Sequence, residues 1–446
     1  MGEKLLGTEN ISKLFGKYTI PAVVSMVIGG SQTLIGGMIL GKYVGANALA
    51  TVNIVNPFVQ FAMAVSFVIA FGALSIIGRN LGSGDQRIAQ NTFKTALLII
   101  IGFATCYGVF GFVNAPLLAK WLGANDVLMD GVVLYLRTFS LFIAFHPLMI
   151  LTGFADRIVG KPQLYLHATL SMLLVNTTMS MLLIKYLGFG VKGAALATGL
   201  AMMSGFIVTV RPMLNKAHTI NVFAGHFDTS TIVPMMYNGS SEGIGSASTA
   251  LAIYLFNLEF MRRIGPNGVA AFTTISFVVT FGTSVIFGIA DGISPIVSYN
   301  YGHQKYDRVK SVMRLATIGG FIIGCILFSV LLLGGESLAG MFADAEEVVQ
   351  VARGGATVYA FAFLVNSFNI IYSVYFTSIG GAKESAMIAF SRGILWIVIG
   401  INVWPMLFDL TGVWMTIPVA ESMTVLLVMY LVKVNPVDNR VLVSEL

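Results

Sequence analysis

Three acidic residues lie inside long apolar stretches of this sequence, where carboxylates are rare. They are Glu242, Asp291 and Glu421, and all three fall in the second half of the chain. Counted from a helix start near Ser230 at about 1.5 Å per residue, Glu242 lies roughly 18 Å into an apolar layer about 30 Å thick. A carboxylate at that depth is costly unless it faces water, finds a partner or carries a proton, so it indicates a functional site.

The residues around Glu242 are small, and two interpretations of them stay open. They include Gly239, Ser240, Ser241 and Gly243. They would leave room for water or a ligand beside the helix, and Pro234 would let the helix bend. Alternatively, they only allow close helix packing, and Glu242 is a hydrogen-bonded structural acid.

The other two acids have local contexts of their own. Asp291 lies between Gly288 and Pro295, where a broken helix would free backbone carbonyls to share a cation or a proton. The alternative for Asp291 is an ion pair with Arg or Lys near the inner surface. Glu421 follows Pro418 and could simply satisfy a kinked helix. We predict a cation-coupling site that is formed by Glu242, Asp291 and Glu421.

The composition indicates a membrane protein. Of 446 residues, 56% are hydrophobic and 10% are charged, whereas soluble proteins have about 25% charged residues. Twelve windows of about 20 apolar residues predict an all-α protein with twelve transmembrane helices in contact with a lipid bilayer. The distribution of Lys and Arg predicts that both termini are cytoplasmic, and we expect the protein in the plasma (inner) membrane. These basic residues stand singly in short loops, so the net charge of +6 does not indicate a nucleic-acid partner.

The chain repeats itself at an offset of about 220 residues. The segment 45–50 corresponds to 265–270, and 69–72 corresponds to 289–292. We therefore predict two six-helix lobes in the same orientation, residues 1–212 and 230–446, with a cleft between them. Residues 213–229 are predicted to form a cytoplasmic linker. Its His218, His226 and Asp228 are expected to lie in an exposed, solvated loop and not in a metal site.

Aromatic, methionine and amide side chains on the same helices are candidates for a substrate site. Aromatic faces attract organic cations by about 0.5–2 kcal/mol each, and methionine adapts to varied shapes. No phosphate loop and no hydrolytic or metalloprotease motif is present, so we expect neither catalysis, nor a metal site, nor a cofactor apart from a coupling ion. The predicted substrate-binding residues are Tyr254, Phe277, Phe281, Met236, Asn366, Asn369 and Tyr372.

Several motifs resemble the multidrug and toxic compound extrusion (MATE) family over essentially the whole chain. The run 294–302, SPIVSYNYG, resembles the end of that family's eighth helix, and 190–198, GVKGAALAT, resembles the start of its sixth. The stretch from Gly412 through Pro418 to Glu421 resembles its twelfth helix. The resemblance implies a monomeric secondary antiporter that exports amphipathic organic cations in exchange for H⁺ or Na⁺. It also implies a coupling role for Glu242, because many relatives carry a seventh-helix glutamate at this position.

Three positions depart from the family pattern. Gly36 stands where many bacterial relatives have a first-helix aspartate, Asp291 stands where we expect glutamine, and the tenth helix offers Asn366 and Asn369 but no acid. The coupling ion therefore stays open. We favour H⁺, because a proton needs one buried acid whereas Na⁺ needs about five or six oxygens.

Two other functions stay open. A lipid-linked precursor flippase of the same superfamily would favour a cleft rich in arginine for phosphate groups. An intramembrane enzyme or a sensor could use the same acids, but neither would need a duplication of six helices.

Overall fold

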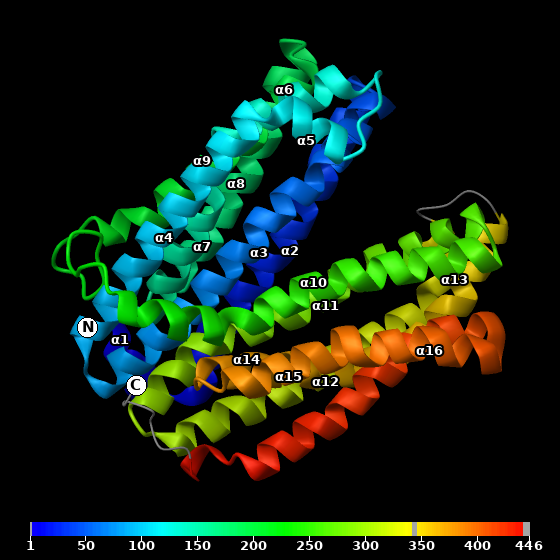
Figure 1. Cartoon of the computed structure of the whole chain (residues 1–446). Coiled ribbons are helices and arrows are strands. Elements are labelled where there is room, and N and C mark those ends of the chain that lie inside the picture. The colour runs from blue at the N-terminus through cyan, green and yellow to red at the C-terminus, as the bar shows by residue number, and fades with distance from the viewer. Residues whose placement is uncertain (1, 341–345, 440–446) are drawn as a thin grey trace. The chain divides into compact units, whose positions relative to one another are not determined.

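The computed structural model describes residues 2–340 and 346–439, and within them it contains helices and no strands (Figure 1). This confirms the all-α prediction. The helices of the first half are α1 (Gly2–Thr8), α2 (Ile11–Tyr43), α3 (Ala46–Ser83), α4 (Gln86–Val113), α5 (Ala115–Trp121), α6 (Met129–Ser140), α7 (Phe145–Ile158), α8 (Gln163–Ser180), the π-helix η1 (Met181–Tyr186) and α9 (Gly190–Met213). Those of the second half are η2 (Thr229–Thr231), α10 (Ile232–Arg263), α11 (Pro266–Gly302), α12 (Tyr306–Gly340), α13 (Glu346–Tyr359), η3 (Ala360–Ala362), α14 (Phe363–Ser378), α15 (Ala382–Phe390), the π-helix η4 (Ser391–Leu395), α16 (Trp396–Val434) and η5 (Val437–Asn439).

The helical stretches account for twelve membrane crossings. Among the described residues, 11 stretches are long and apolar enough to cross a membrane, and the last of them covers 53 residues, 382–434. Within α16, Phe408 and Asp409 leave the helical conformation, with φ of −129° and 48°. Because Asp409 has a positive φ that interrupts any α-helix, this stretch consists of two spans. The predicted fold of twelve transmembrane helices in two repeats is confirmed.

Glycine marks equivalent turns in the two repeats. Gly45, between α2 and α3, has φ of 107°, and Gly265, between α10 and α11, has φ of 84°. Only glycine adopts these backbone conformations readily, because a Cβ atom would clash with the backbone. The sequence repeat at these two positions therefore records the same turn before the second long helix of each half.

The described residues pack into two compact units that exchange short segments. The first unit holds α1 and Val24–Gly239, and the second holds Glu9–Val23 and the residues from Ser240 onward. The start of α2 thus packs with the C-terminal half, and the start of α10 packs with the N-terminal half. The lobe boundaries 1–212 and 230–446 follow sequence order and stay a prediction. They do not describe this exchange.

The two exchanged segments, residues 232–239 and 9–23, pack against Gly72 and Gly292, which occupy equivalent positions of the repeat. In the first unit, a Cβ atom on Gly72 of α3 would overlap the carbonyl oxygen of Met235, and one on Gly239 of α10 would overlap that of Val68. In the second unit, a Cβ atom on Gly292 of α11 would lie 2.7 Å from the Cα of Thr19 in α2. Backbones approach this closely only where side chains are absent, as in other small-residue helix contacts.

The linker between the repeats is anchored to α4, all within the first unit. The Gln90 amide donates to the carbonyls of Asn221 (2.7 Å) and Ala224 (3.0 Å), and its oxygen accepts from the Asn221 N–H (2.9 Å). Lys94 Nζ donates to the Val222 carbonyl at 2.7 Å, and Ile220 is fully buried. Most residues of 214–229 are exposed or half-buried, as expected for a loop, but polar side chains of α4 bind the backbone around the buried Ile220 and Asn221.

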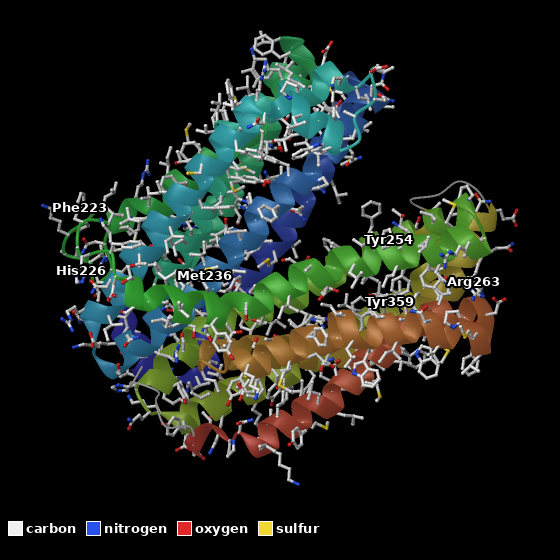
Figure 2. All side chains as sticks on the ribbon, in the orientation of Figure 1. Phe223, His226, Met236, Tyr254, Arg263 and Tyr359 are labelled. Atoms are coloured by element: carbon white, nitrogen blue, oxygen red, sulfur yellow. The ribbon has the colours of Figure 1, made fainter. Side chains whose placement is uncertain are left out.

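The histidines of the linker bind protein groups. His226, labelled in Figure 2, lies 3.2 Å from Asn91 Nδ2, and His218 Nε2 lies 3.1 Å from Lys161 Nζ. No group of three or more metal-ligating side chains occurs in the described part of the chain. The linker is thus held on α4 by hydrogen bonds.

Candidate functional site

Glu242 lies on the first third of α10, in the second compact unit. The side chain is half-buried, and no described residue forms a hydrogen bond with its carboxylate. Asp291 on α11 and Arg392 on η4 are close enough for their charges to act on it. Pro234 lies in the first turn of α10, where its missing N–H has no helical partner to lose, so the helix is not interrupted there. Glu242 is therefore a membrane-embedded acid whose electrostatic neighbours come from other helices.

Asp291 is buried, at 3% exposure, on a helix that continues through it. The expectation of a broken helix is wrong, since α11 runs from Pro266 to Gly302 without interruption. Pro295 nevertheless has no N–H to donate to the Asp291 carbonyl four residues earlier. The helix thus changes its hydrogen bonding at Asp291 without unwinding.

Two separate sets of hydroxyl groups connect α10 and α11, the helices that carry these acids, to α14. Ser241, next to Glu242, lies 3.2 Å from Thr377 Oγ1 on α14, which lies 2.7 Å from Ser385 Oγ on α15. Ser294, one turn after Asp291, lies 2.8 Å from Ser378 Oγ. Because each hydroxyl both donates and accepts, each set can reorient its hydrogen bonds when a nearby charge changes.

Glu421 is tied to its neighbours by several hydrogen bonds. Its Oε1 accepts from Arg392 Nη2 at 2.5 Å and from Arg392 Nε at 3.2 Å. Its Oε2 accepts from Asn369 Nδ2 at 2.7 Å. A buried carboxylate with an arginine and an amide as partners is satisfied, in contrast to Glu242.

The amides of α14 supply oxygen atoms with no recorded donor. Asn366 and Asn369 are buried at 4% and 0% exposure, and within the described chain no group donates to either Oδ1 atom. Buried acceptors normally have a partner, so these two oxygens could accept a hydrogen bond from a ligand or contribute to an ion. They remain predicted substrate-binding residues.

The remaining predicted substrate-binding residues lie in different surroundings. Tyr254 on α10 is 64% exposed, and Phe277 and Phe281 on α11 are 52% and 48% exposed. Met236 precedes them on α10 and belongs to the first unit (Figure 2). Tyr372 lines a separate cavity between α12, α14 and α16. The structure does not test a substrate role for any of them, and these assignments stay predictions.

Arg392 is the residue of this region that the sequence analysis missed. It lies in the π-helix η4 with Glu421 as its partner. Gly393 beside it allows Ser248 of α10 to approach the same turn. An arginine within an apolar run, followed by glycine, was the available signal, since π-helical turns often occur at functional sites.

Two positions of the first unit bear on the missing first-helix acid. Asn176 Oδ1 lies 3.6 Å from where a Cβ atom of Gly36 would stand, so this is the neighbourhood of the absent aspartate. The first unit has a buried acid elsewhere, Asp156 at the end of α7, with 0% exposure and no hydrogen-bond partner for its carboxylate among the described residues. Buried acids are thus present in both units, but at positions that the repeat does not relate.

Twelve apolar helices, an internal repeat and buried acids define a multi-pass membrane transporter. The family model named MatE matches residues 21–182 and 231–401, that is, both repeats. The chain belongs to the MatE family, and the resemblance found in its motifs is confirmed.

The relatives and solved structures agree with this family. Multidrug export protein MepA of Staphylococcus haemolyticus is 22% identical over 445 residues, covering 98% of this chain and 96% of the relative. Multidrug export protein MepA of Staphylococcus aureus (strain NCTC 8325 / PS 47) is 20% identical over 427 residues, with 95% and 93% coverage.

Among solved structures, a MATE transporter in complex with MaL6 has a TM-score of 0.91 at 19% identity, with 98% of this chain and 99% of that chain covered. A MOP superfamily transporter from Pyrococcus furiosus has a TM-score of 0.90 at 18% identity, with the same coverage. At these identities the structures establish the fold.

Proposed function

We propose that this protein is a secondary antiporter that exports amphipathic organic cations in exchange for H⁺ by alternating access. The observation that supports the proposal is the half-buried carboxylate of Glu242, which has no hydrogen-bond partner among the described residues. A satisfied structural acid would have such partners, as Glu421 does. The relatives named as multidrug export proteins support the direction and the substrate class.

Competition for one negative charge would couple the two fluxes. When Glu242 holds a proton, the site is neutral and attracts an organic cation weakly. When the proton leaves, the carboxylate attracts the cation strongly. Because a ligand shifts a conformational equilibrium only by its differential affinity for the two states, proton and substrate must bind the same or linked charge with opposite preference.

The choice of H⁺ over Na⁺ rests on the donor atoms. A sodium site needs about five or six oxygens at close range. The described residues hold no cluster of three or more acidic, histidine or cysteine side chains. Glu421 already binds Arg392 and Asn369, whereas the Glu242 carboxylate has no hydrogen-bond partner among the described residues. A single acid with hydroxyl neighbours suits a proton better.

The test measures efflux of a fluorescent organic cation from proteoliposomes under separate gradients. We expect efflux under an imposed pH gradient at equal Na⁺ and none under a Na⁺ gradient at equal pH. Efflux that follows only the Na⁺ gradient would contradict the choice of ion. Failure of a folded, reconstituted sample to move any cation under either gradient would contradict the antiporter itself.

The flippase alternative predicts a cleft that is rich in free arginine. Arg392 pairs with Glu421, and the buried Arg157 packs over the Tyr165 ring at 4.3 Å. Neither forms a group of cations for a lipid-linked phosphate. We therefore retain the antiporter. An enzyme or a sensor is not supported by the comparisons, which match transporters.

A further inference from the structure

A cavity of about 480 Å³ lies within the second unit, between the start of α12, the second half of α14 and the end of α16. In Figure 1 the three helices form part of the same bundle. The cavity size is within the range of small-molecule sites. Its wall includes Lys310, Met313, Arg314, Thr317, Tyr372 and Val432.

Two cations from successive turns of α12 line this cavity. Lys310 Nζ lies 2.6 Å from Asp438 Oδ2, and both side chains of this pair are about half exposed. For Arg314, no carboxylate or other hydrogen-bond partner occurs among the described residues. An exposed ion pair contributes little to stability. Lys310 can therefore exchange Asp438 for another anion, and the Arg314 guanidinium has all its donors available.

Two hydroxyl groups extend this polar side into the cavity wall. Thr317 Oγ1 is buried and has no hydrogen-bond partner within the described structure. Tyr372 is half-buried and packs against Phe368 in a tilted arrangement, with ring centroids 4.4 Å apart. Its hydroxyl has no recorded partner in the described residues. A buried hydroxyl that finds no partner is costly, so a ligand acceptor at this position would be favourable.

The cavity lies where the sequence of α12 changes from charged to apolar residues. Arg314 is the last charged residue before the uncharged run 315–335 of α12, and it lies roughly 12 Å along the helix from Tyr306. The cations thus lie at the height of lipid head groups, whereas Met313, Ile318 and Val432 supply apolar wall. Basic pockets between transmembrane helices at this height are suited to lipid phosphates.

We propose that the cavity between α12, α14 and α16 binds the phosphate head group of an acidic phospholipid. Arg314 and Lys310 bind the phosphate oxygens, and Thr317 and Tyr372 donate to the phosphate or to the glycerol ester. The acyl chains lie along the apolar wall and continue into the bilayer. The site is separate from Glu242 and does not depend on the proposed transport function.

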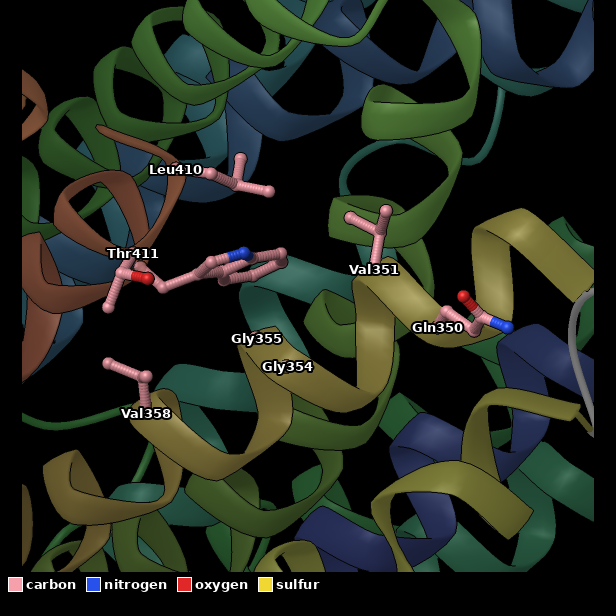
Figure 3. A pocket seen from close by; sticks show the side chains of 8 residues that line it. Gln350, Val351, Gly354, Gly355, Val358, Leu410 and Thr411 are labelled. Carbon is pink, nitrogen blue, oxygen red and sulfur yellow. The ribbon is translucent and has the colours of Figure 1, made fainter. Parts of the chain in front are cut away.

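A second cavity in the same unit provides a comparison. It has about 290 Å³ and lies between α13 and α16, where the Trp414 indole packs against Gly355 (Figure 3). Its lining includes Gln350 and Thr411 but no charged residue. Basic side chains therefore line the cavity at α12 but not the second cavity of this unit.

The test is native mass spectrometry of the purified full chain in detergent, titrated with phosphatidylglycerol, phosphatidylcholine or inorganic phosphate. We expect saturable binding of one phosphatidylglycerol and at least about tenfold weaker binding of phosphatidylcholine. We expect inorganic phosphate alone to bind more weakly than phosphatidylglycerol. Phosphate that binds as tightly as the lipid would overturn the lipid assignment.

The variants separate the site from general surface attraction. Arg314→Gln should weaken phosphatidylglycerol binding about tenfold, and Thr317→Val, which keeps the shape, about threefold. The matched control is Lys433→Gln, an exposed cation in the last turn of α16 that does not line the cavity. It should leave binding unchanged. Equal losses from Arg314→Gln and Lys433→Gln, or equal binding of the two lipids, would refute the proposal. Gel filtration of each variant confirms that it is folded.

Discussion

Arg392 Nη2 on η4 donates to Glu421 Oε1 on α16 at 2.5 Å, and the two residues are 29 positions apart in the chain. The side chains are 21% and 7% exposed, so the pair is largely removed from water. This ion pair distinguishes Glu421 from Glu242, the other glutamate in the interior of the membrane-spanning helices. Glu421 holds η4 against α16, whereas the Glu242 carboxylate has no hydrogen-bond partner among the described residues and is the acid that we propose for the exchanged ion.

Removing one partner of this pair should destabilise the fold. We expect Glu421→Gln to lower the free energy of unfolding by about 2–4 kcal/mol, because Arg392 then keeps a buried charge without its partner. The double variant Glu421→Gln with Arg392→Gln should recover part of the loss. Thermal unfolding in detergent measures both. A double variant less stable than either single variant would show that the pair is not the cause.

Glu242 should control transport and not stability. Glu242→Gln keeps the shape and fixes the neutral form, so we expect normal insertion, weaker binding of cationic substrates and loss of gradient-driven efflux. Asp291→Asn should reduce efflux less, if its charge only tunes Glu242. Efflux assays on reconstituted variants provide the measurement. Near wild-type transport by Glu242→Gln would exclude the mechanism, and a total loss from Asp291→Asn would place the ion on α11.

The glycine contacts of the exchanged segments should tolerate no side chain. Gly239→Ala would place a methyl group against the Val68 carbonyl, and overpacking of this kind costs roughly 1–3 kcal/mol. The control on the same helix is Gly245→Ala, because a Cβ atom there meets no atom within 4 Å. We expect Gly239→Ala to lower the unfolding temperature and Gly245→Ala to leave it unchanged or raise it. Equal effects would mean that helix propensity alone decides the result.

The linker should be released when its anchor on α4 is removed. Gln90→Ala loses three hydrogen bonds to linker backbone, so we expect faster proteolysis between residues 214 and 228. Gln86→Ala is the matched control, because Gln86 is exposed on the same helix. The cleavage rate of the folded protein is compared by gel and mass spectrometry. If both variants are cleaved at the wild-type rate, the hydrogen bonds of Gln90 do not hold the linker.

Asp228 should add a pH-dependent contribution at the start of η2. Its carboxylate accepts from Ser230 Oγ at 2.6 Å and from the Ser230 N–H at 3.0 Å. The hydrogen bond from the Ser230 hydroxyl is the main cause that lowers the Asp228 pKa below its ordinary value of 3.8. A lowered pKa stabilises the fold above the ordinary value, and this stabilisation is lost as the pH falls through the folded-state pKa.

The comparison that tests this effect is wild type against Asp228→Asn, which keeps a capping oxygen but has no charge. The difference in unfolding temperature should be constant from about pH 7.5 to about pH 5 and shrink below about pH 4. A difference that changes between neutral pH and about pH 5 would contradict this origin.

The twelve helices and the repeat could be predicted because apolar length and glycine spacing are local properties of the chain. Gly45 and Gly265 record the same turn directly in the sequence. The partners of the acids could not be predicted. Arg392 and Glu421 meet only after η4 and α16 pack, and no local pattern specifies that meeting. The hydrogen bonds of Gln90 to the linker, 131 residues away for Asn221, are equally non-local.

The exchanged segments have a consequence for biosynthesis. The first compact unit includes 232–239, which the ribosome makes after all six helices of the first repeat, and the second includes Glu9–Val23, made at the very beginning. Residues 9–23 must therefore remain available in the nascent chain until α11 presents Gly288 and Gly292. A gene cut between the repeats would leave both products without a native packing partner. A duplication that began as two separate chains would therefore have needed to associate before it could fold completely.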